Sequence, residues 1–195
     1  MQYQARTFSI PEIKGISQKQ VDAHLGLYQG YVKQTNLLMT ELARLSSDAS
    51  NAYIVGELRK RFGFEWNGMR LHELYFEQLE GGAHVVNAEM NIYSLLSKQF
   101  GSYDIWFEEF THLSGRGPGW SLLDYDPVSK QFHHVWAEDH QVGQLAGAKV
   151  VFALDHWEHA YLLDYAPAEK QKYLDAYFAN VNWEVVSKRF DTLQA

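Results

Sequence analysis

The stretch Asp155-His156-Trp157-Glu158-His159 sets a carboxylate and an imidazole four residues apart. Residues at positions i and i+4 lie on one face of a helical turn, so Asp155 and His159 could converge on a single metal ion. The same spacing is also typical of a plain ion pair or hydrogen bond. The pair by itself therefore leaves both interpretations open.

Two more histidines, His24 and His72, fall on apolar faces of predicted helices. The first helix is predicted from a capping box at Ser17 to Gln20 as far as about Leu45, with His24, Tyr28 and Tyr31 on one stripe. A later helical pattern, Met69 to Leu79, places His72 on the same face as Phe76. A buried imidazole needs a partner, and either a hydrogen bond or a metal would serve.

The composition limits the chemistry that these side chains can do. The 195 residues include nine histidines and no cysteine, so any metal must be held by nitrogen and oxygen ligands. A net charge of −7 argues against a nucleic-acid surface. No apolar run approaches the roughly 20 residues that cross a bilayer. We expect a cytoplasmic protein that binds neither nucleic acid nor membrane.

The elements that position these residues divide the chain at Gly81-Gly82. Residues 1–82 are predicted to form an antiparallel helical hairpin domain, with a helical pattern over 51–62 and an interruption at Gly63 and Asn67-Gly68. Residues 83–195 are predicted to form an α/β domain with a small three-stranded antiparallel sheet, which makes the fold class α+β. Its expected helices cover 86–100, 102–113, 168–179 and 183–193, and its expected strands cover 120–125, 131–137 and 148–154, with a hairpin turn at Asp126-Pro127.

Taken together, these segments resemble the iron/manganese superoxide dismutase family over nearly the whole chain. The stretch from Asp155 to Tyr161 is similar to the family's signature. Phe100 to Phe110 resembles the segment that opens the family's second domain. Gly117-x-Gly119-Trp120 resembles its turn into the first strand, and Val181 to Glu184 resembles the start of its last helix.

The resemblance implies an oxidoreductase that disproportionates superoxide to dioxygen and hydrogen peroxide. It implies one Fe or Mn ion per subunit, and it assigns four ligands to that ion: His24, His72, Asp155 and His159. Tyr31 matches the family's phenol near the substrate channel, with a spacing from His24 that is one residue shorter. The resemblance makes Trp120, Trp157 and Phe76 the walls of the pocket, and it makes Glu158 a bridge across the interface of a homodimer.

The group that bonds the metal-bound solvent stays open at this point. Iron-type relatives carry a glutamine at the position of Gly68, which has no side chain to offer. Manganese-type relatives carry it in the second domain, where His140 and Gln141 both lie near the matching position. Two further departures, Tyr28 and Leu162, replace groups that hydrogen bond each other across the family's interface.

Two other functions fit the same residues. A non-catalytic structural or binding relative on this fold would keep the architecture without the reaction, because a fold does not fix a function. A mononuclear iron enzyme that acts on another small oxidant would keep the ligands. Four intact ligand positions favour the dismutase.

Overall fold

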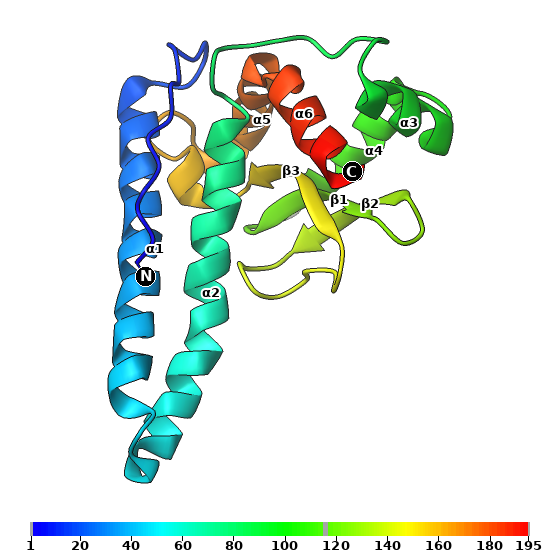
Figure 1. Cartoon of the computed structure of the whole chain (residues 1–195). Helices are drawn as coiled ribbons and strands as arrows, with labels where there is room; N and C mark the ends of the chain where they lie inside the picture. Colours follow the sequence, from blue (N-terminus) through cyan, green and yellow to red (C-terminus); the bar gives the residue numbers. More distant parts are fainter. Residues whose placement is uncertain (1, 115–116, 195) are drawn as a thin grey trace.

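The computed structural model describes residues 2–114 and 117–194. Two long antiparallel helices, α1 (Gln18–Leu45) and α2 (Ala52–Glu77), form a hairpin closed by a short 3₁₀ turn, as Figure 1 shows. The predicted helical hairpin is confirmed. Helix α1 begins where its cap predicts, because the Ser17 side chain accepts a hydrogen bond from the Gln20 N–H at 3.1 Å.

The predicted interruption of the second helix is wrong, since α2 continues through Gly63 and Gly68. A glycine inside a helix costs about 1 kcal/mol relative to alanine, a penalty that packing along the length of α1 can outweigh. Gly68 also has a steric role. A Cβ there would lie 2.7 Å from the ring of Tyr31, so only glycine lets the two helices approach at this level.

The second half of the chain is a three-stranded antiparallel sheet with helices around it. The sheet has the order β2 (Gln131–Ala137), β1 (Trp120–Asp126), β3 (Lys149–Asp155), so the last strand pairs with the first. These findings confirm the α+β class and the predicted sheet. The remaining elements of the described residues are α3 (Asn91–Phe100), α4 (Tyr103–Ser114), β1 (Trp120–Asp126), β2 (Gln131–Ala137), β3 (Lys149–Asp155), α5 (Lys170–Asn180) and α6 (Trp183–Gln194).

The helix expected from Val86 begins only at Asn91. The preceding residues have other backbone partners. His84 donates its N–H to Val181 O at 3.1 Å and accepts from Trp183 N at 3.0 Å, which ties the linker to the start of α6. The Asn87 side chain then accepts from Glu89 N at 3.0 Å, in a turn typical of asparagine. The apolar pattern of 86–90 therefore belongs to a docked linker.

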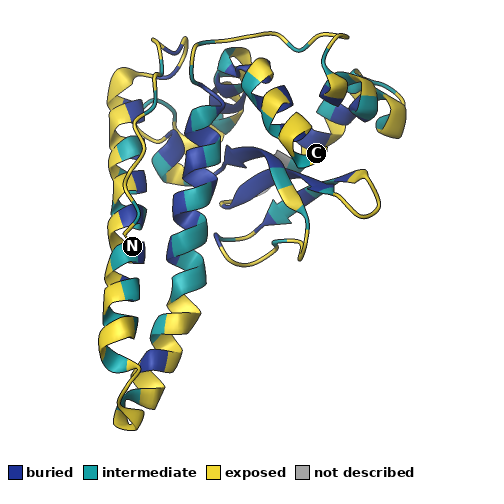
Figure 2. Cartoon of the chain, viewed as in Figure 1, coloured by how far each residue is buried: buried dark blue, intermediate teal, exposed yellow. Residues whose placement is uncertain are grey.

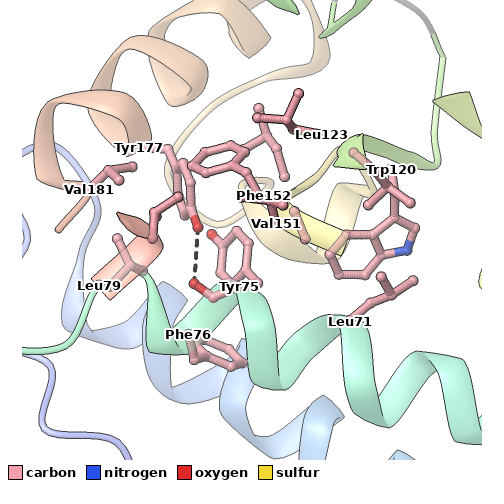
Figure 3. Packing of buried hydrophobic residues seen from close by; sticks show 14 of the residues in the cluster. Leu71, Tyr75, Phe76, Leu79, Trp120, Leu123, Val151, Phe152, Tyr177 and Val181 are labelled. Carbon is pink, nitrogen blue, oxygen red and sulfur yellow. Dashed lines mark hydrogen bonds between the residues drawn. The ribbon is translucent and has the colours of Figure 1, made fainter. Parts of the chain in front are cut away.

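The core lies where α2 meets the sheet. Figure 2 shows buried residues concentrated on the strands and on the sheet-facing side of α2, while the hairpin tip is largely exposed. In the close view of Figure 3, Leu71 of α2 lies near Trp120 of β1, Tyr75 of α2 points toward Val151 and Phe152 of β3, and Leu79, just beyond the helix, lies near Val181. Burying each large apolar side chain contributes about 1.5–3 kcal/mol. This contact holds together the elements that carry His72 and Asp155.

No helix within the described ranges is both long and apolar enough to cross a membrane. The division into 1–82 and 83–195 stays a prediction.

Candidate metal centre

Four side chains from distant parts of the chain converge between the hairpin and the sheet. His24 comes from α1, His72 from α2, Asp155 from the last position of β3, and His159 from the 3₁₀ helix Glu158–Ala160. Each offers one ligand atom, and the four atoms lie within 4.8 Å of one another. The Nε2 atoms of His24, His72 and His159 lie 3.1, 3.4 and 3.0 Å from the same oxygen, Asp155 Oδ2.

Asp155 and His159 converge, but not on a helical turn as their spacing suggested. The chain leaves β3 at Asp155, and the other carboxylate oxygen, Oδ1, accepts a hydrogen bond from Trp157 N at 2.9 Å. That bond turns the backbone so that His159 points back at Oδ2. The Gln20 side chain then secures the turn from α1, since its Nε2 donates to His159 O at 2.7 Å.

The hydrogen bonds of His72 show what the centre needs. Its Nδ1 lies 2.6 Å from the carbonyl oxygen of Gly68, and a carbonyl can only accept, so Nδ1 carries the proton. In a neutral ring Nε2 is then bare. This fully buried nitrogen has no hydrogen-bond partner within the described residues, and it faces the Asp155 carboxylate. Two lone pairs facing each other repel unless a cation lies between them.

The protonation states of the three buried groups, His24, His72 and Asp155, suit metal binding, which requires neutral imidazole and ionised carboxylate. Burial lowers the pKa of His24, and it holds the pKa of His72 well below its ordinary value. Burial would raise the pKa of Asp155, but the neighbouring His159 and His24 outweigh it and hold that pKa well below its usual range. The buried part of the centre therefore offers two neutral imidazoles and one ionised carboxylate.

The donor set and its spacing fit a first-row metal ion. Imidazole suits Fe, and carboxylate oxygen suits both Fe and Mn. Metal–ligand bonds of about 2.1 Å place adjacent ligand atoms about 3–3.6 Å apart, for angles from a right angle to 120°. The three nitrogens lie 3.0 to 3.4 Å from Asp155 Oδ2. The distances to the shared carboxylate oxygen therefore agree with one ion bound by all four residues.

A second row of side chains lies against the centre. The Trp120 indole donates from Nε1 to His140 Nδ1 at 2.9 Å, and His140 Nε2 lies 2.8 Å from the Tyr31 hydroxyl. Indole can only donate, so His140 Nδ1 must be the acceptor. Burial lowers the pKa of His140 to about 4, which keeps the ring neutral with its proton on Nε2. His140 therefore donates to Tyr31, whose own hydroxyl hydrogen is free to point elsewhere.

His140 and Gln141, the two candidates for the group that bonds the metal-bound solvent, lie in different surroundings. His140 is buried against Phe64, with ring centroids 4.6 Å apart. Gln141 is exposed, and its backbone N–H bonds the Asp139 side chain at 2.6 Å. The structure thus brings His140, and not Gln141, against Tyr31. The shorter spacing between His24 and Tyr31 is accommodated, since the Tyr31 ring lies 5.0 Å from the His72 ring.

The three expected wall residues all lie against the ligands. Phe76 packs edge-on against His24 at 4.9 Å, and Trp120 does the same against His72 at 5.1 Å between ring centroids. Trp157 is nearly parallel to His159 at 6.2 Å. Phe76 and Trp120 are fully buried, so this part of the site excludes bulk water.

Glu158 points away from the ligands. It is exposed and lines a surface cavity of about 610 Å³ together with His159 and Lys170. His159 is the only one of the four ligand side chains that reaches this surface: it is 27% exposed, whereas His24 is 2% and His72 and Asp155 are 0% exposed. Within one subunit, the centre therefore comes nearest to the surface at His159, beside Glu158.

Sequence reasoning missed two residues that hold the ligands in place. Gln20 was interpreted only as part of a capping box, although its side chain bonds His159 O and, at 2.9 Å, accepts from Leu163 N. Tyr173 donates to Asp155 O at 2.8 Å from within α5. No local pattern could have found them, because a hydrogen bond between distant segments leaves no periodicity in the sequence.

Comparison with known proteins agrees with this geometry. Residues 88–189 match the model of the iron/manganese superoxide dismutase C-terminal domain. The chain is 34% identical over 183 residues to an iron superoxide dismutase of Cupriavidus metallidurans, covering 92% of this chain and 90% of the relative. It is 32% identical over 166 residues to a manganese superoxide dismutase of Halobacterium salinarum, with 84% and 80% covered. An iron superoxide dismutase of Aquifex pyrophilus is 31% identical over 185 residues, with 92% and 86% covered.

A helical hairpin joined to a small antiparallel sheet, with a buried three-histidine and one-aspartate group between them, defines a mononuclear metalloenzyme. The chain belongs to the iron/manganese superoxide dismutases. It disproportionates superoxide at a mononuclear Fe or Mn site, and the buried group of four matches that site.

Proposed function

We propose that His24, His72, Asp155 and His159 bind one Fe or Mn ion per subunit, and that Tyr31 and His140 order the protons that turnover consumes. The observation that carries the ligand roles is the bare Nε2 of His72, which faces the Asp155 carboxylate at 3.4 Å. A hydrogen-bonded cluster without an ion leaves this contact repulsive, and an ion between the two atoms makes it favourable.

A bound Fe or Mn ion would supply the one-electron redox chemistry by which one superoxide becomes dioxygen and a second, with two protons, becomes hydrogen peroxide. The chain's own residues bind, orient and protonate. Asp155 and the three imidazoles would hold the ion, and because Asp155 is the one carboxylate among the four ligands, the occupied site would keep a net positive charge that attracts an anion. Phe76 and Trp120 keep bulk water from the buried side of the site.

Proton delivery is the proposed role of Tyr31. His140 donates from Nε2 to the Tyr31 oxygen, so the phenolic hydrogen is left to donate toward the substrate side. Burial raises the pKa of Tyr31, and the Asp155 charge raises it further, so the phenol stays protonated at neutral pH. A fixed donor of this kind hydrogen bonds a developing peroxide without losing its proton to solvent. Gln141 is proposed to have no part in proton delivery.

Reconstitution with each metal tests the assignment. Metal-free protein is loaded separately with Fe and with Mn, and metal content and superoxide turnover are measured for each form. We expect about one ion per subunit and turnover with at least one metal. Wild-type protein that binds either ion tightly but does not consume superoxide would favour a non-catalytic relative.

The same cavity supports a homodimer. Glu158 is exposed beside His159, and the adjoining side chains of Leu162 and Leu163 are 48% and 51% exposed. We propose that two subunits meet here and that Glu158 bonds the partner's His159, as the resemblance implied. Tyr28 and Leu162, which replace the two residues that hydrogen bond each other across the family's interface, agree with a different contact here. The Tyr28 hydroxyl already bonds Glu73 within its own subunit at 3.1 Å.

Sedimentation equilibrium tests the interface. Glu158→Ala is expected to weaken the dimer, while Glu57→Ala, an exposed glutamate on α2, leaves it unchanged. Equal behaviour of both variants contradicts the proposed contact. The cytoplasmic location stays a prediction, which cell fractionation would check.

A further inference from the structure

Gln78, the residue after the end of α2, pairs its side-chain amide with the backbone of β3. Its Nε2 donates to Ala153 O and its Oε1 accepts from Ala153 N, both at 2.9 Å. In the sheet β3 has a neighbour on one side only, so these bonds satisfy backbone groups on its open edge. The Gln78 amide thus makes the pair of hydrogen bonds that one residue of a neighbouring strand would make.

Every hydrogen-bonding position of this amide is used. The second Nε2 hydrogen goes to the Tyr177 hydroxyl at 2.8 Å, and Oε1 also accepts from Arg189 at 2.9 Å. Gln78 is fully buried, so an unpaired polar atom here would cost about 1–3 kcal/mol. A fully satisfied buried amide is confined to one position and orientation.

Arg189 of α6 holds the Gln78 amide in place through a hydrogen bond to its oxygen. Its guanidinium donates to Val151 O of β3 at 2.8 Å and, on α2, to Leu74 O at 3.2 Å and the Glu77 carboxylate at 2.6 Å. The side chain is only 11% exposed, and the Glu77 contact compensates its charge. One planar group therefore bonds α2, the residue Gln78 that follows it, and β3 at once.

Gln78 and Arg189 join α2 to β3 close to the metal centre on both elements. His72 lies on α2 six residues before Gln78, and Asp155 lies two residues after Ala153 on the same strand. The apolar packing in Figure 3 brings α2 and β3 together, but such packing is not directional. The hydrogen bonds of Gln78 and Arg189 are directional, and they fix the relative position of the helix and the strand.

We propose that Gln78, held by Arg189, is a positioning residue that sets the separation of His72 and Asp155 and thereby the relative affinity of the centre for Fe and Mn. The inference rests on the ligand roles proposed above. Metals with similar ligand preferences are distinguished chiefly by site geometry. Residues that orient ligands from outside typically change metal affinity by about 10–100-fold when substituted.

The chain contains a matched control on the opposite edge of the sheet. Gln99 of α3 donates from Nε2 to Phe132 O at 2.7 Å and accepts from Phe132 N at 2.8 Å. Residue type and pairing are the same as for Gln78. The strand it bonds is β2, which carries none of the four ligands. Loss of either glutamine removes an equivalent pair of edge bonds, and only one pair adjoins the centre.

The experiment compares Gln78→Met with Gln99→Met, in which an unbranched apolar side chain replaces the amide. Metal-free proteins are titrated with Fe²⁺ and Mn²⁺ under anaerobic competition, and the Mn²⁺ forms are examined by electron paramagnetic resonance. Both variants are expected to unfold at lower denaturant concentration. Only Gln78→Met is expected to change the Fe²⁺/Mn²⁺ affinity ratio, by about tenfold, and to alter the Mn²⁺ spectrum.

Identical affinity ratios and spectra for the two variants overturn the proposal. If Gln78→Met does not fold, Arg189→Lys is tested in its place, because lysine keeps the charge but cannot bond all four acceptors. An unchanged Fe²⁺/Mn²⁺ affinity ratio and an unchanged Mn²⁺ spectrum in that variant also overturn the proposal. Failure of the ligand assignment looks different: wild-type protein would bind neither ion, or His72→Ala would bind both as wild type does.

Discussion

The two halves of the metal centre are built in different ways. The hairpin supplies His24, His72 and Tyr31 from the interior of long regular helices. The sheet side supplies Asp155 from a strand end, His159 from a 3₁₀ turn, and His140 from a loop. The helical ligands are sealed in the core, whereas His159 reaches the surface cavity. The helices thus provide a rigid base for the centre, and the irregular side brings one ligand to the surface of the subunit.

The sharpest test of this difference is chemical rescue. His72→Ala and His159→Ala are each expected to lower metal affinity and turnover by more than about 100-fold, since even outer partners of metal ligands are worth 10–100-fold. Added imidazole is expected to restore turnover only to His159→Ala, and at protein concentrations low enough to separate the proposed dimer, because its vacated position adjoins the 610 Å³ cavity while that of His72 is buried. Equal rescue of both variants breaks the comparison.

The second test of the difference between the two halves is the pH dependence of stability, through His140 on the sheet side. The pKa of His140 is about 4 in the folded chain, against about 6.5 unfolded. Above pH 6.5 the ring is neutral in both states and its contribution is fully present. As the pH falls toward 4 the unfolded chain takes up the proton first, so about 3 kcal/mol of stability is lost.

Denaturant unfolding of metal-free protein between pH 7 and pH 4 measures this loss. His140→Gln is the matched variant, because its amide can accept from Trp120 and donate to Tyr31 without titrating. The difference between the two proteins isolates His140 from the ligands, which titrate in both. Parallel stability profiles contradict the assignment of a neutral, buried His140.

Removal of one hydroxyl on the hairpin side has a smaller effect. Tyr31→Phe removes the phenolic donor and leaves the His140 Nε2 hydrogen without an acceptor, so turnover is expected to fall about 10-fold or more. Metal content is expected to stay the same. Tyr28→Phe is the control on the same helix: its hydroxyl bonds Glu73 and Arg6, so that variant loses stability and keeps turnover. Equal turnover of the two variants argues against a role for Tyr31.

The smallest expected effect concerns the space between the helices. Gly68→Ala gains about 1 kcal/mol of helix propensity, but its Cβ would lie 2.7 Å from the Tyr31 ring, and overpacking typically costs about 1–3 kcal/mol. Gly56→Ala, which meets nothing within 4 Å on the same helix, is expected only to stabilise. Thermal unfolding of both variants measures the difference, and two equal increases in Tm would exclude the clash.

The contrast between the halves also explains what could be predicted from sequence. Helical periodicity placed His24, Tyr31 and His72 on inward faces, because a regular helix repeats its geometry with every turn. Asp155 and His159 were paired for a reason that proved wrong, since their convergence depends on the Trp157 N–H bond to the carboxylate. His140 could not be separated from Gln141, because a loop has no periodicity that tells which of two neighbours points inward.

The contact between Tyr31 and Gly68 has an evolutionary consequence. The ring occupies the space that any side chain at position 68 would need, so the present Tyr31 and a larger residue there exclude each other. A lineage with its outer hydrogen-bonding group at His140 therefore cannot transfer that group to position 68 by a single substitution. The intermediate would either displace the phenol or carry two competing donors. In this packing, a hydrogen-bonding side chain at position 68 therefore requires a coupled change at position 31.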